Sequence, residues 1–285
     1  MDIQLLHKEN IACFSALCSS WELSQVLDPD GAFLSGCIGL GCIGEHAKPC
    51  ALLLASPNED RTVYTVTTLR CPRQFLSTAG ERLLRTFREY AQLNGARKLV
   101  YSYTAPDPIA ELLNSCGWSK PEVQGCVYRV TDSAPLLAAV DRLKSENSPV
   151  IPFFDVPIQA RSRFSQRFGA DVDPKSDYNL VVAPDPRLSL ACMDGDELAG
   201  YLLCCVTPEG LELRCAYVEH SRLPLLGTMA KEFASRCRAG QHDRAPLDIH
   251  THTAFGDQIM HKLLGAIPCQ QFRFMTSHLD LMGSD

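Results

Sequence analysis

The sequence lacks a long uninterrupted apolar segment. The longest run without a charged residue, Gly31 to Gly44, is interrupted by glycines and is too short to span a bilayer. The N-terminal residues MDIQLLHKEN carry charges where a secretory signal needs its apolar region. These absences predict a cytoplasmic protein that does not bind membranes.

An excess of positive charge is also missing. The chain of 285 residues has 27 basic and 33 acidic residues, which gives a net charge of -6. This balance argues against nonspecific attraction to nucleic acid. The length and the 46% hydrophobic content are those of a packed globular protein with two domains of ordinary size.

The fourteen cysteines include no Cys-x-x-Cys pair, and no spacing among them fits a zinc site. In a reducing cytosol most of them are expected to be buried, small apolar residues. His250 and His252 lie on the same side of a predicted strand but lack a third ligand at a suitable spacing. We therefore predict no metal site.

The stretch from Gly39 to Gly44, GLGCIG, matches the Gly-x-Gly-x-x-Gly fingerprint of dinucleotide-binding folds. That fingerprint requires a helix directly after the glycines, because the helix N-terminus holds the pyrophosphate. Pro49 follows within five residues of Gly44 and would break the first turns of such a helix. We interpret the stretch as the end of a strand, followed by a polar turn and another strand.

The first half predicts strands, a long helix, a strand, a short helix and a closing strand. The predicted strands are 40–46, 50–56, 62–69, 98–103 and 125–130, and the predicted helices are 76–94 and 107–116. The second half repeats this order, with strands 188–193, 198–206, 211–218, 247–252 and 271–275 and helices 225–238 and 255–264.

Two copies of one unit explain this order. Gly117 and Gly265 align at an offset of 148 residues (265 minus 117), and the same offset places Leu99 on Leu247. We predict an α/β fold of two units in tandem, each a mixed sheet with helices on both faces. The expected domains are 1–135 and 150–285, joined by a polar linker at 131–149.

The first unit resembles the GCN5-related N-acetyltransferases over most of its length. In that family a strand leads into Arg or Gln, two residues, Gly, one residue, and Gly or Ala, at the start of a helix. The sequence from Leu69 to Leu84, LRCPRQFLSTAGERLL, has this order. Aligned from the strand, the motif positions fall on Gln74, Ser77 and Ala79; aligned from the helix, they fall on Phe75, Thr78 and Gly80.

The resemblance implies that acetyl-CoA binds the first unit. Its pyrophosphate would lie at the first turn of the helix, where free backbone N–H groups and the helix dipole favour an anion. Thr78 and Glu81 form a capping-box pattern, and Ala79→Glu is predicted to abolish binding with the fold intact. The predicted coenzyme site comprises Leu69, Arg70, Cys71, Gln74, Phe75, Leu76, Ser77, Thr78, Ala79, Gly80 and Asp107, with Arg73 and Arg82 as further cations.

The family's usual tyrosine, four residues before a Gly-aromatic pair, is Leu113 in this chain. Leucine cannot protonate a leaving thiolate. In the second unit the 148-residue offset places His261 there, and histidine donates protons near neutral pH. We predict Glu219, His220 and His261 as catalytic candidates, with Glu212 as an additional candidate base.

The predicted function is transfer of an acetyl group from acetyl-CoA to an amine of a small molecule or peptide. The competing hypothesis is a noncatalytic binding or regulatory module that keeps the fold, which the missing tyrosine favours. A third possibility, aminoacyl or peptidyl transfer, rests on the duplication alone. The second unit has no Gly-x-Gly or Gly-x-Ala between residues 218 and 227, so we do not expect coenzyme binding there.

Overall fold

The structure is a computed structural model that describes residues 1–7, 9–17, 38–58, 60–168, 184–207, 209–265 and 267–281, with His46 and His220 described by their backbone only. The chain forms two compact units. Unit 1 comprises Met1–Gln124 and Arg273–Asp285, and unit 2 comprises Gly125–Phe272. No helix in the described ranges is long and apolar enough to cross a membrane.

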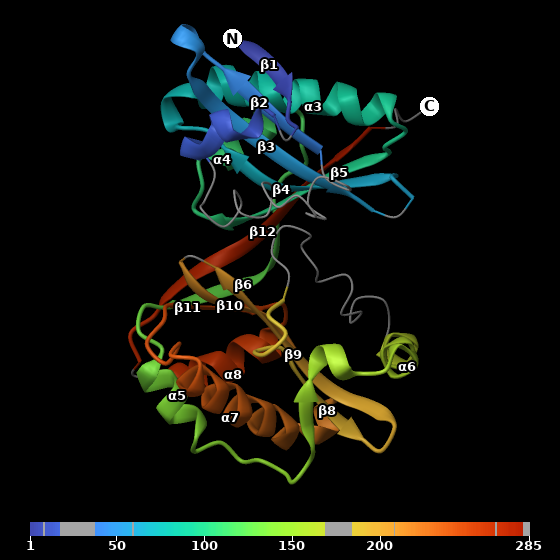
Figure 1. The fold of residues 1–285 in the computed structure, drawn as a ribbon, viewed down its shortest axis with the longest axis vertical. Coiled ribbons are helices and arrows are strands. Elements are labelled where there is room, and N and C mark those ends of the chain that lie inside the picture. Colours follow the sequence, from blue (N-terminus) through green and yellow to red (C-terminus); the bar gives the residue numbers. More distant parts are fainter. Residues whose placement is uncertain are drawn as a thin grey trace. The chain divides into compact units, whose positions relative to one another are not determined.

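Unit 1 is built on a mixed sheet whose only parallel pair among the described strands is β4 and β5 (Figure 1). The strand order is β1 (Asp2–Leu5), β2 (Ile38–Ile43), β3 (Pro49–Pro57), β4 (Val63–Arg70), β5 (Lys98–Ala105) and β12 (Gln270–Asp280). The helical segments are η1 (Ile11–Leu17), η2 (Glu45–Ala47), η3 (Arg73–Phe75), η4 (Leu76–Gly80), α3 (Glu81–Leu93) and α4 (Ile109–Ser115).

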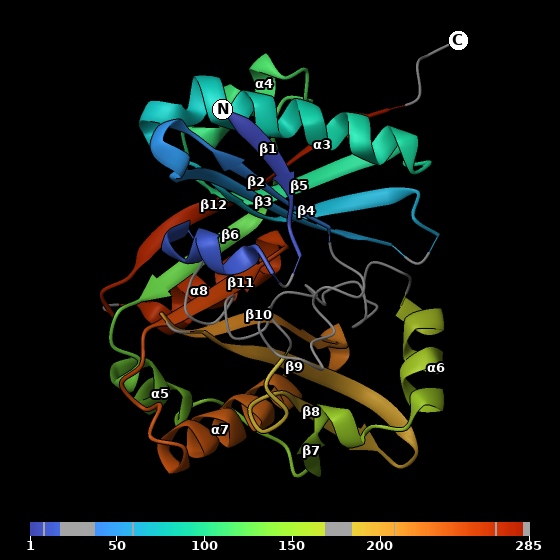
Figure 2. The same ribbon diagram turned by 45° about the horizontal axis from the view of Figure 1, so that its top comes forward.

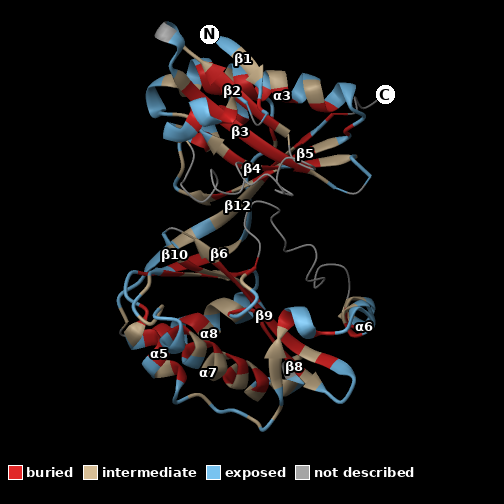
Figure 3. Ribbon diagram, viewed as in Figure 1, coloured by how far each residue is buried: buried red, intermediate tan, exposed pale blue. Residues whose placement is uncertain are grey.

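Helix α3 covers one face of this sheet because its apolar residues recur at helical spacing. Leu83, Leu84, Phe87 and Ala91 are all buried in the core of the unit. The ring of Phe87 meets Tyr64 of β4 edge to face, with ring centroids 6.2 Å apart. Helix α4 contributes to the same core. Figure 3 shows the buried segments of the strands in red.

The other face of the sheet explains the glycines of GLGCIG. These residues form strand β2 and the short turn after it, and η2 and β3 follow, so the interpretation as strand, turn and strand is confirmed. A Cβ atom on Gly41 would lie 2.1 Å from the ring of Phe14 in η1. Glycine is therefore required at this position for close packing of η1 on β2.

Unit 2 repeats the architecture of unit 1 (Figure 2). Its strand order is β6 (Glu122–Val130), β11 (Leu247–Thr251), β10 (Gly210–Val218), β9 (Glu197–Thr207), β8 (Leu190–Asp194) and β7 (Val150–Pro152). The helical segments are α5 (Ala134–Val140), η5 (Phe153–Asp155), α6 (Ile158–Phe168), η7 (His220–Arg222), α7 (Pro224–Ala239) and α8 (Ala254–Leu264).

Helices cover both faces of the unit 2 sheet. One apolar core lies under α5, α7 and α8, and a second, which includes Phe153, Phe164 and Tyr201, lies under α6. Two units of mixed α/β structure with helices on both faces are thus confirmed. Gly117 and Gly265 both have positive φ and end the helices that follow β5 and β11, as the 148-residue repeat predicts.

The boundaries of the two units differ from those expected from the sequence. Strand β6 pairs antiparallel with β11 in unit 2, from Cys126↔Thr251 to Val130↔Leu247. Strand β12 pairs antiparallel with β5 in unit 1, from Arg273↔Ala105 to Asp280↔Lys98. Each unit therefore takes its last strand from the other half of the sequence, and the ranges 1–135 and 150–285 do not describe the units.

The expected linker at 131–149 is also corrected. Its apolar residues Leu136, Leu137 and Val140 form the buried side of α5, and this helix packs against α7 and α8. The polar composition of the segment concealed this short apolar stretch.

Candidate active site

Strands β4 and β5 pair over the first part of their length only. The parallel ladder runs from Val63↔Lys98 to Val66↔Tyr101. A bulge then follows at Thr67, whose hydroxyl donates to the carbonyl of Leu54 on β3 at 3.2 Å. The described ladder between β4 and β5 ends before this bulge. The two strands therefore diverge toward their C-terminal ends.

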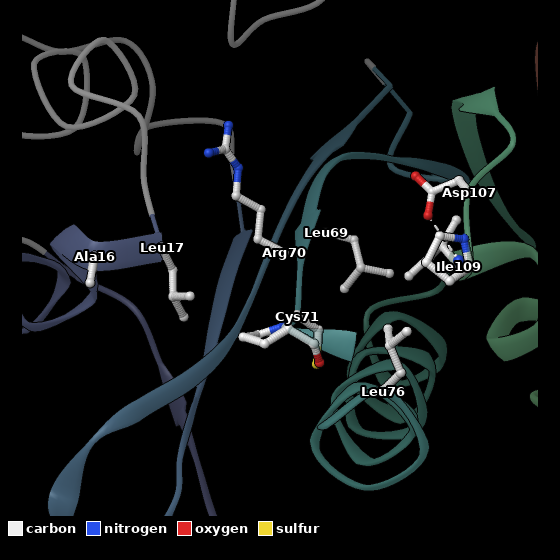
Figure 4. A pocket seen from close by; sticks show the side chains of 10 residues that line it. Ala16, Leu17, Leu69, Arg70, Cys71, Leu76, Asp107 and Ile109 are labelled. Carbon is white, nitrogen blue, oxygen red and sulfur yellow. Dashed lines mark hydrogen bonds between the residues drawn. The ribbon is translucent and has the colours of Figure 1, made fainter. Parts of the chain in front are cut away.

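A cavity of about 380 Å³ lies where the strands open. Figure 4 shows its lining from η1, from the end of β4 with the loop after it, and from the start of α4. Most of the lining residues have apolar side chains, and one cation and one carboxylate are among them. The residues are Ala16, Leu17, Leu69, Arg70, Cys71, Pro72, Leu76, Asp107, Pro108 and Ile109.

The carboxylate of Asp107 is held at the start of α4. Its Oδ1 accepts the backbone N–H of Ile109 at 2.9 Å. Burial, reinforced by the negative charge of Asp107, raises the pKa of the neighbouring Tyr101, although Arg70 opposes the shift. The Tyr101 hydroxyl therefore stays protonated at neutral pH and does not serve as a base.

The thiol of Cys71 also lines the cavity. Burial raises its pKa to about 11, although a hydrogen bond from the Gly80 backbone N–H works in the opposite direction. At neutral pH the group is a thiol, so Cys71 is not poised to act as a nucleophile. It contributes an apolar surface next to Leu69 and Leu76.

The loop before α3 has a π-helical turn at the place where the two alignments of the family motif diverge. Leu76–Gly80 form a π-helical turn, and regular α-helix begins at Glu81. A π turn contains one residue more than an α turn. The strand-based and helix-based alignments differ by one residue, which is the length that the π turn adds.

Side chains of this turn divide into exposed and buried groups. Ser77 and Thr78 are exposed, as is Gln74 before them, whereas Ala79 and Gly80 are buried. Ala79 is 0% exposed in the core of unit 1, so a glutamate there would disrupt packing. The expectation that Ala79→Glu leaves the fold intact is therefore wrong, and Ser77 is the position to substitute.

The predicted capping box is also wrong. The Thr78 hydroxyl donates to the carbonyl of Phe75 at 3.3 Å and does not cap a helix N–H group. The carboxylate of Glu81 instead pairs with Arg85 one turn later at 2.6 Å. The helical segment already begins at Leu76, before both residues, so neither of them occupies its N-cap position.

The arginines predicted for the phosphates have different surroundings. Arg70 lines the cavity and Arg73 is exposed on the following loop. Arg82 donates to the backbone carbonyl of Met1 at the start of the chain. Arg70 and Arg73 therefore lie near the turn, whereas Arg82 is held at the first residue of the chain.

The catalytic candidates of unit 2 lie on different elements. Glu219 precedes η7 and accepts from Arg167 of α6 at 3.2 Å. The Nε2 atom of His261 on α8 lies 3.4 Å from the Tyr128 hydroxyl. The side chain of His220 falls outside the described residues. No described contact joins Glu219 to His261, and their catalytic roles remain predictions.

A charged cluster in unit 2 was not recognised as a unit from the sequence. Nε2 of His250 lies 2.9 Å from Oε1 of Glu212, and Arg214 donates to Oε2 of the same carboxylate at 3.0 Å. Burial raises the pKa of Glu212, but the His250 hydrogen bond and the Arg214 charge outweigh it and lower the pKa to about 2. Glu212 is thus a poor base, contrary to the expectation from the sequence.

The alternation of side chains along β10 and β11 is the feature of the sequence that could have pointed to this cluster. Residues two apart on β10 and on β11 face the same side of a sheet, but their pairing depends on the register.

Within the described ranges, no group of three or more His, Cys, Asp or Glu side chains is arranged to hold a metal ion.

No protein-family model and no curated protein sequence matches the chain. Solved structures do match. A tandem GNAT protein from the clavulanic acid biosynthesis pathway, solved without AcCoA, aligns with a TM-score of 0.70 and 14% identity over 100% of both chains. A GCN5-related N-acetyltransferase from Sphaerobacter thermophilus aligns with a TM-score of 0.58 and 12% identity, over 100% of this chain and 96% of that chain.

A probable N-acyltransferase from Enterococcus faecalis V583 has a TM-score of 0.58 and 9% identity, over 97% of this chain and 71% of that chain. The likeness to all three is one of fold, and it extends over both units. The resemblance noted in the sequence of unit 1 is therefore confirmed for the architecture of the whole chain.

Proposed function

We propose that this chain, which has the tandem fold of the GCN5-related N-acetyltransferases, transfers an acetyl group from acetyl-CoA to an amine of a small molecule or peptide. The observation that carries the proposal is the cavity at the opening between β4 and β5 in unit 1. Apolar side chains line part of it, and it includes Leu76 of the helical turn whose Ser77 and Thr78 are exposed, which suits a ligand with an apolar arm and a phosphate end.

The residues of unit 1 fit the coenzyme in two parts. The backbone of Leu76 to Gly80 would hold the pyrophosphate at the start of α3, with Arg70 and Arg73 nearby. The pantetheine would lie beside Leu69 to Cys71, past the point where the β4–β5 ladder ends. Backbone N–H groups there would also bind the carbonyl oxygen as negative charge develops on it.

When bound, acetyl-CoA supplies a thioester whose carbonyl carbon is attacked by a neutral amine, with release of the CoA thiolate. Asp107 is the one carboxylate among the residues that line the described cavity, and we assign to it the removal of a proton from the incoming ammonium. Leu113 is buried in the core and carries no acidic proton. After the attack the nitrogen loses its second proton to water, and the thiolate therefore takes up a proton from water or from another group.

Calorimetry on the full chain tests coenzyme binding with acetyl-CoA, free CoA and longer acyl-CoAs. Ser77→Glu places a negative charge at an exposed position of the turn, so we expect affinity to fall at least about tenfold. Ser77→Ala is the matched control and keeps the affinity. Absence of heat with every acyl-CoA rejects the proposal.

A noncatalytic binding module is the second candidate, favoured by the buried leucine at position 113. The two functions separate in one assay, because an enzyme releases free CoA in the presence of a suitable amine. Binding of acetyl-CoA without turnover on a broad panel of small amines and peptide N-termini supports the module. Asp107→Asn then has no effect on binding, whereas in an enzyme it lowers turnover.

A further inference from the structure

The residues 143–148, here called the strap, run across the first turns of α7 in unit 2. The Thr228 hydroxyl accepts the backbone N–H of Glu146 at 3.0 Å and donates to the backbone carbonyl of Glu146 at 2.8 Å. Nζ of Lys231 donates to the Ser145 hydroxyl at 3.0 Å. The strap is thus hydrogen-bonded to two successive turns of the helix.

A glycine on α7 allows this close approach. A Cβ atom on Gly227 would lie 2.0 Å from the backbone carbonyl oxygen of Lys144. No side chain fits in that space, so the strap lies directly on the helix backbone. Gly227 is buried as a result.

The strap also brings a carboxylate to the start of the helix. Arg222, in η7 directly before α7, donates to Oε1 of Glu146 at 2.7 Å and to Oδ2 of Asp194 at 2.7 Å. A negative charge near a helix N-terminus is favoured by the helix dipole, and a guanidinium next to it adds to the attraction. An external anion would be bound by the same features.

The internal repeat relates this place to the proposed coenzyme site. Gly80 lies thirteen residues after the bulge at Thr67 of β4 (80 minus 67), and Gly227 lies thirteen residues after the bulge at Arg214 of β10 (227 minus 214). The start of α7 in unit 2 therefore corresponds to the turn before α3 in unit 1. In unit 1 that turn has exposed side chains at Ser77 and Thr78.

We propose that the strap is an internal ligand of unit 2, in which the Glu146 carboxylate takes the place of a phosphate group at the start of α7. The chain then has one site for a nucleotide coenzyme rather than two. The inference of a single coenzyme site rests on the proposed function of unit 1. The inference that the strap is an internal ligand does not depend on that function.

Amide hydrogen exchange of the full chain tests the strap, with inorganic pyrophosphate as the probe. Gly227→Ala forces the strap away from the helix, and Glu146→Gln removes the charge with little change in shape. In both variants we expect residues 143–148 to exchange roughly tenfold faster, which corresponds to about 1.4 kcal/mol. Pyrophosphate then slows exchange at 220–228 in the variants but not in the unmodified chain.

Two matched controls accompany these variants. Gly44→Ala adds a Cβ atom whose nearest neighbour is 3.5 Å away, and Glu197→Gln removes an exposed charge paired with Arg163. Neither changes exchange in the strap. If the Gly227→Ala variant does not fold, the exchange rates of the Glu146→Gln variant decide whether the strap is an internal ligand. Pyrophosphate protection at α7 in the unmodified chain, or none in either variant, overturns the assignment.

Calorimetry with CoA on the unmodified chain gives the number of sites. One mole per mole of chain supports a single coenzyme site, and two moles overturn it. If CoA does not bind at all, the proposed function fails, while the exchange experiment with pyrophosphate still decides whether the strap is an internal ligand.

Discussion

The carboxylate of Glu212 on β10 pairs with the imidazole of His250 on the parallel strand β11, with Oε1 and Nε2 2.9 Å apart. The side chains are 21% and 12% exposed. The second carboxylate oxygen accepts from Arg214, which is 19% exposed and whose Nε has no hydrogen-bond partner among the described groups. Glu212 therefore holds two neighbouring side chains in place.

Glu212→Gln should destabilise the protein at neutral pH. It leaves the Arg214 charge without its partner, so we expect the free energy of unfolding to fall by roughly 2–4 kcal/mol at pH 7. The pKa of Glu212 is lowered to about 2 in the folded chain, so its stabilisation is present above the unfolded value near 4.5. It is lost as the pH falls from there toward 2. Urea unfolding at pH 7 and at pH 3 should show the difference between the two chains shrinking at pH 3.

The control for this prediction is Glu197→Gln. Glu197 pairs with Arg163 at 2.7 Å, but its side chain is 54% exposed. Solvent screening leaves such a pair worth less than about 1 kcal/mol. Equal losses for both variants at pH 7 would contradict the importance of burial at Glu212.

Helices and strands with a clear apolar period were predictable from the sequence. The expected helix at 225–238 is α7 (Pro224–Ala239), and the expected strand at 211–218 is β10 (Gly210–Val218). Both present one apolar face to a core, and that pattern is local. The repeated order of these elements was enough to predict the tandem fold.

Pairing between distant strands was not predictable in the same way. β6 and β12 have ordinary strand sequences, and nothing in them specifies that each pairs beyond its own half of the sequence. The π turn at Leu76–Gly80 appeared in the sequence only as two conflicting alignments.

In the candidate site, Arg70 and Asp107 were predicted, whereas the contribution of Ala16 and Leu17 from η1 was missed. No sequence motif links that short helix to the end of β4.

The exchange of strands predicts that a fragment of residues 1–135 does not fold like unit 1. Residues 273–280 pair with β5 over its whole length, so the fragment leaves β5 as an open sheet edge. It also carries β6 without its partner β11. We expect fast amide exchange at β5 in the fragment and slow exchange in the full chain. A cooperative thermal transition of the fragment, together with CoA binding, would sink this prediction.

Leu279→Ala tests the same strand within the full chain. Leu279 is 8% exposed, belongs to the unit 1 core and pairs with Leu99 of β5. Its truncation should lower the free energy of unfolding by about 2–4 kcal/mol, through lost burial and the cavity left behind. The exposed neighbour Asp280, changed to Ala, is the control and should have little effect. Urea unfolding compares the two.

Leu113→Tyr restores the residue type that the family resemblance expects on α4, but it should not create an efficient acid. Leu113 is 1% exposed in the unit 1 core, so the larger ring overpacks it and costs about 1–3 kcal/mol. We expect a lower melting temperature and no gain in turnover. Leu113→Met, which nearly conserves volume, is the matched control. A gain in turnover with tyrosine would show that the position faces the reacting atoms.

The hydroxyl of Tyr128 is the centre of a polar network in unit 2. It donates to Oδ1 of Asp257 at 3.2 Å, accepts from Nε2 of Gln271 at 3.1 Å and lies 3.4 Å from Nε2 of His261. The Tyr128 and His261 rings pack edge to face at 5.6 Å. These contacts give His261 a structural partner, although it was predicted as a catalytic residue.

Tyr128→Phe and His261→Ala together decide between these roles. Tyr128 is 1% exposed, and loss of its hydroxyl removes hydrogen bonds to exposed or half-buried neighbours, so it should cost about 0.5–1.5 kcal/mol of stability. His261 is exposed, and His261→Ala should cost less. We expect acetyl-CoA affinity and turnover per folded molecule to be unchanged in both, because the strap closes the start of α7 in the same unit. A fall in turnover of about tenfold or more in His261→Ala, at unchanged affinity and stability, would instead establish His261 as the proton donor.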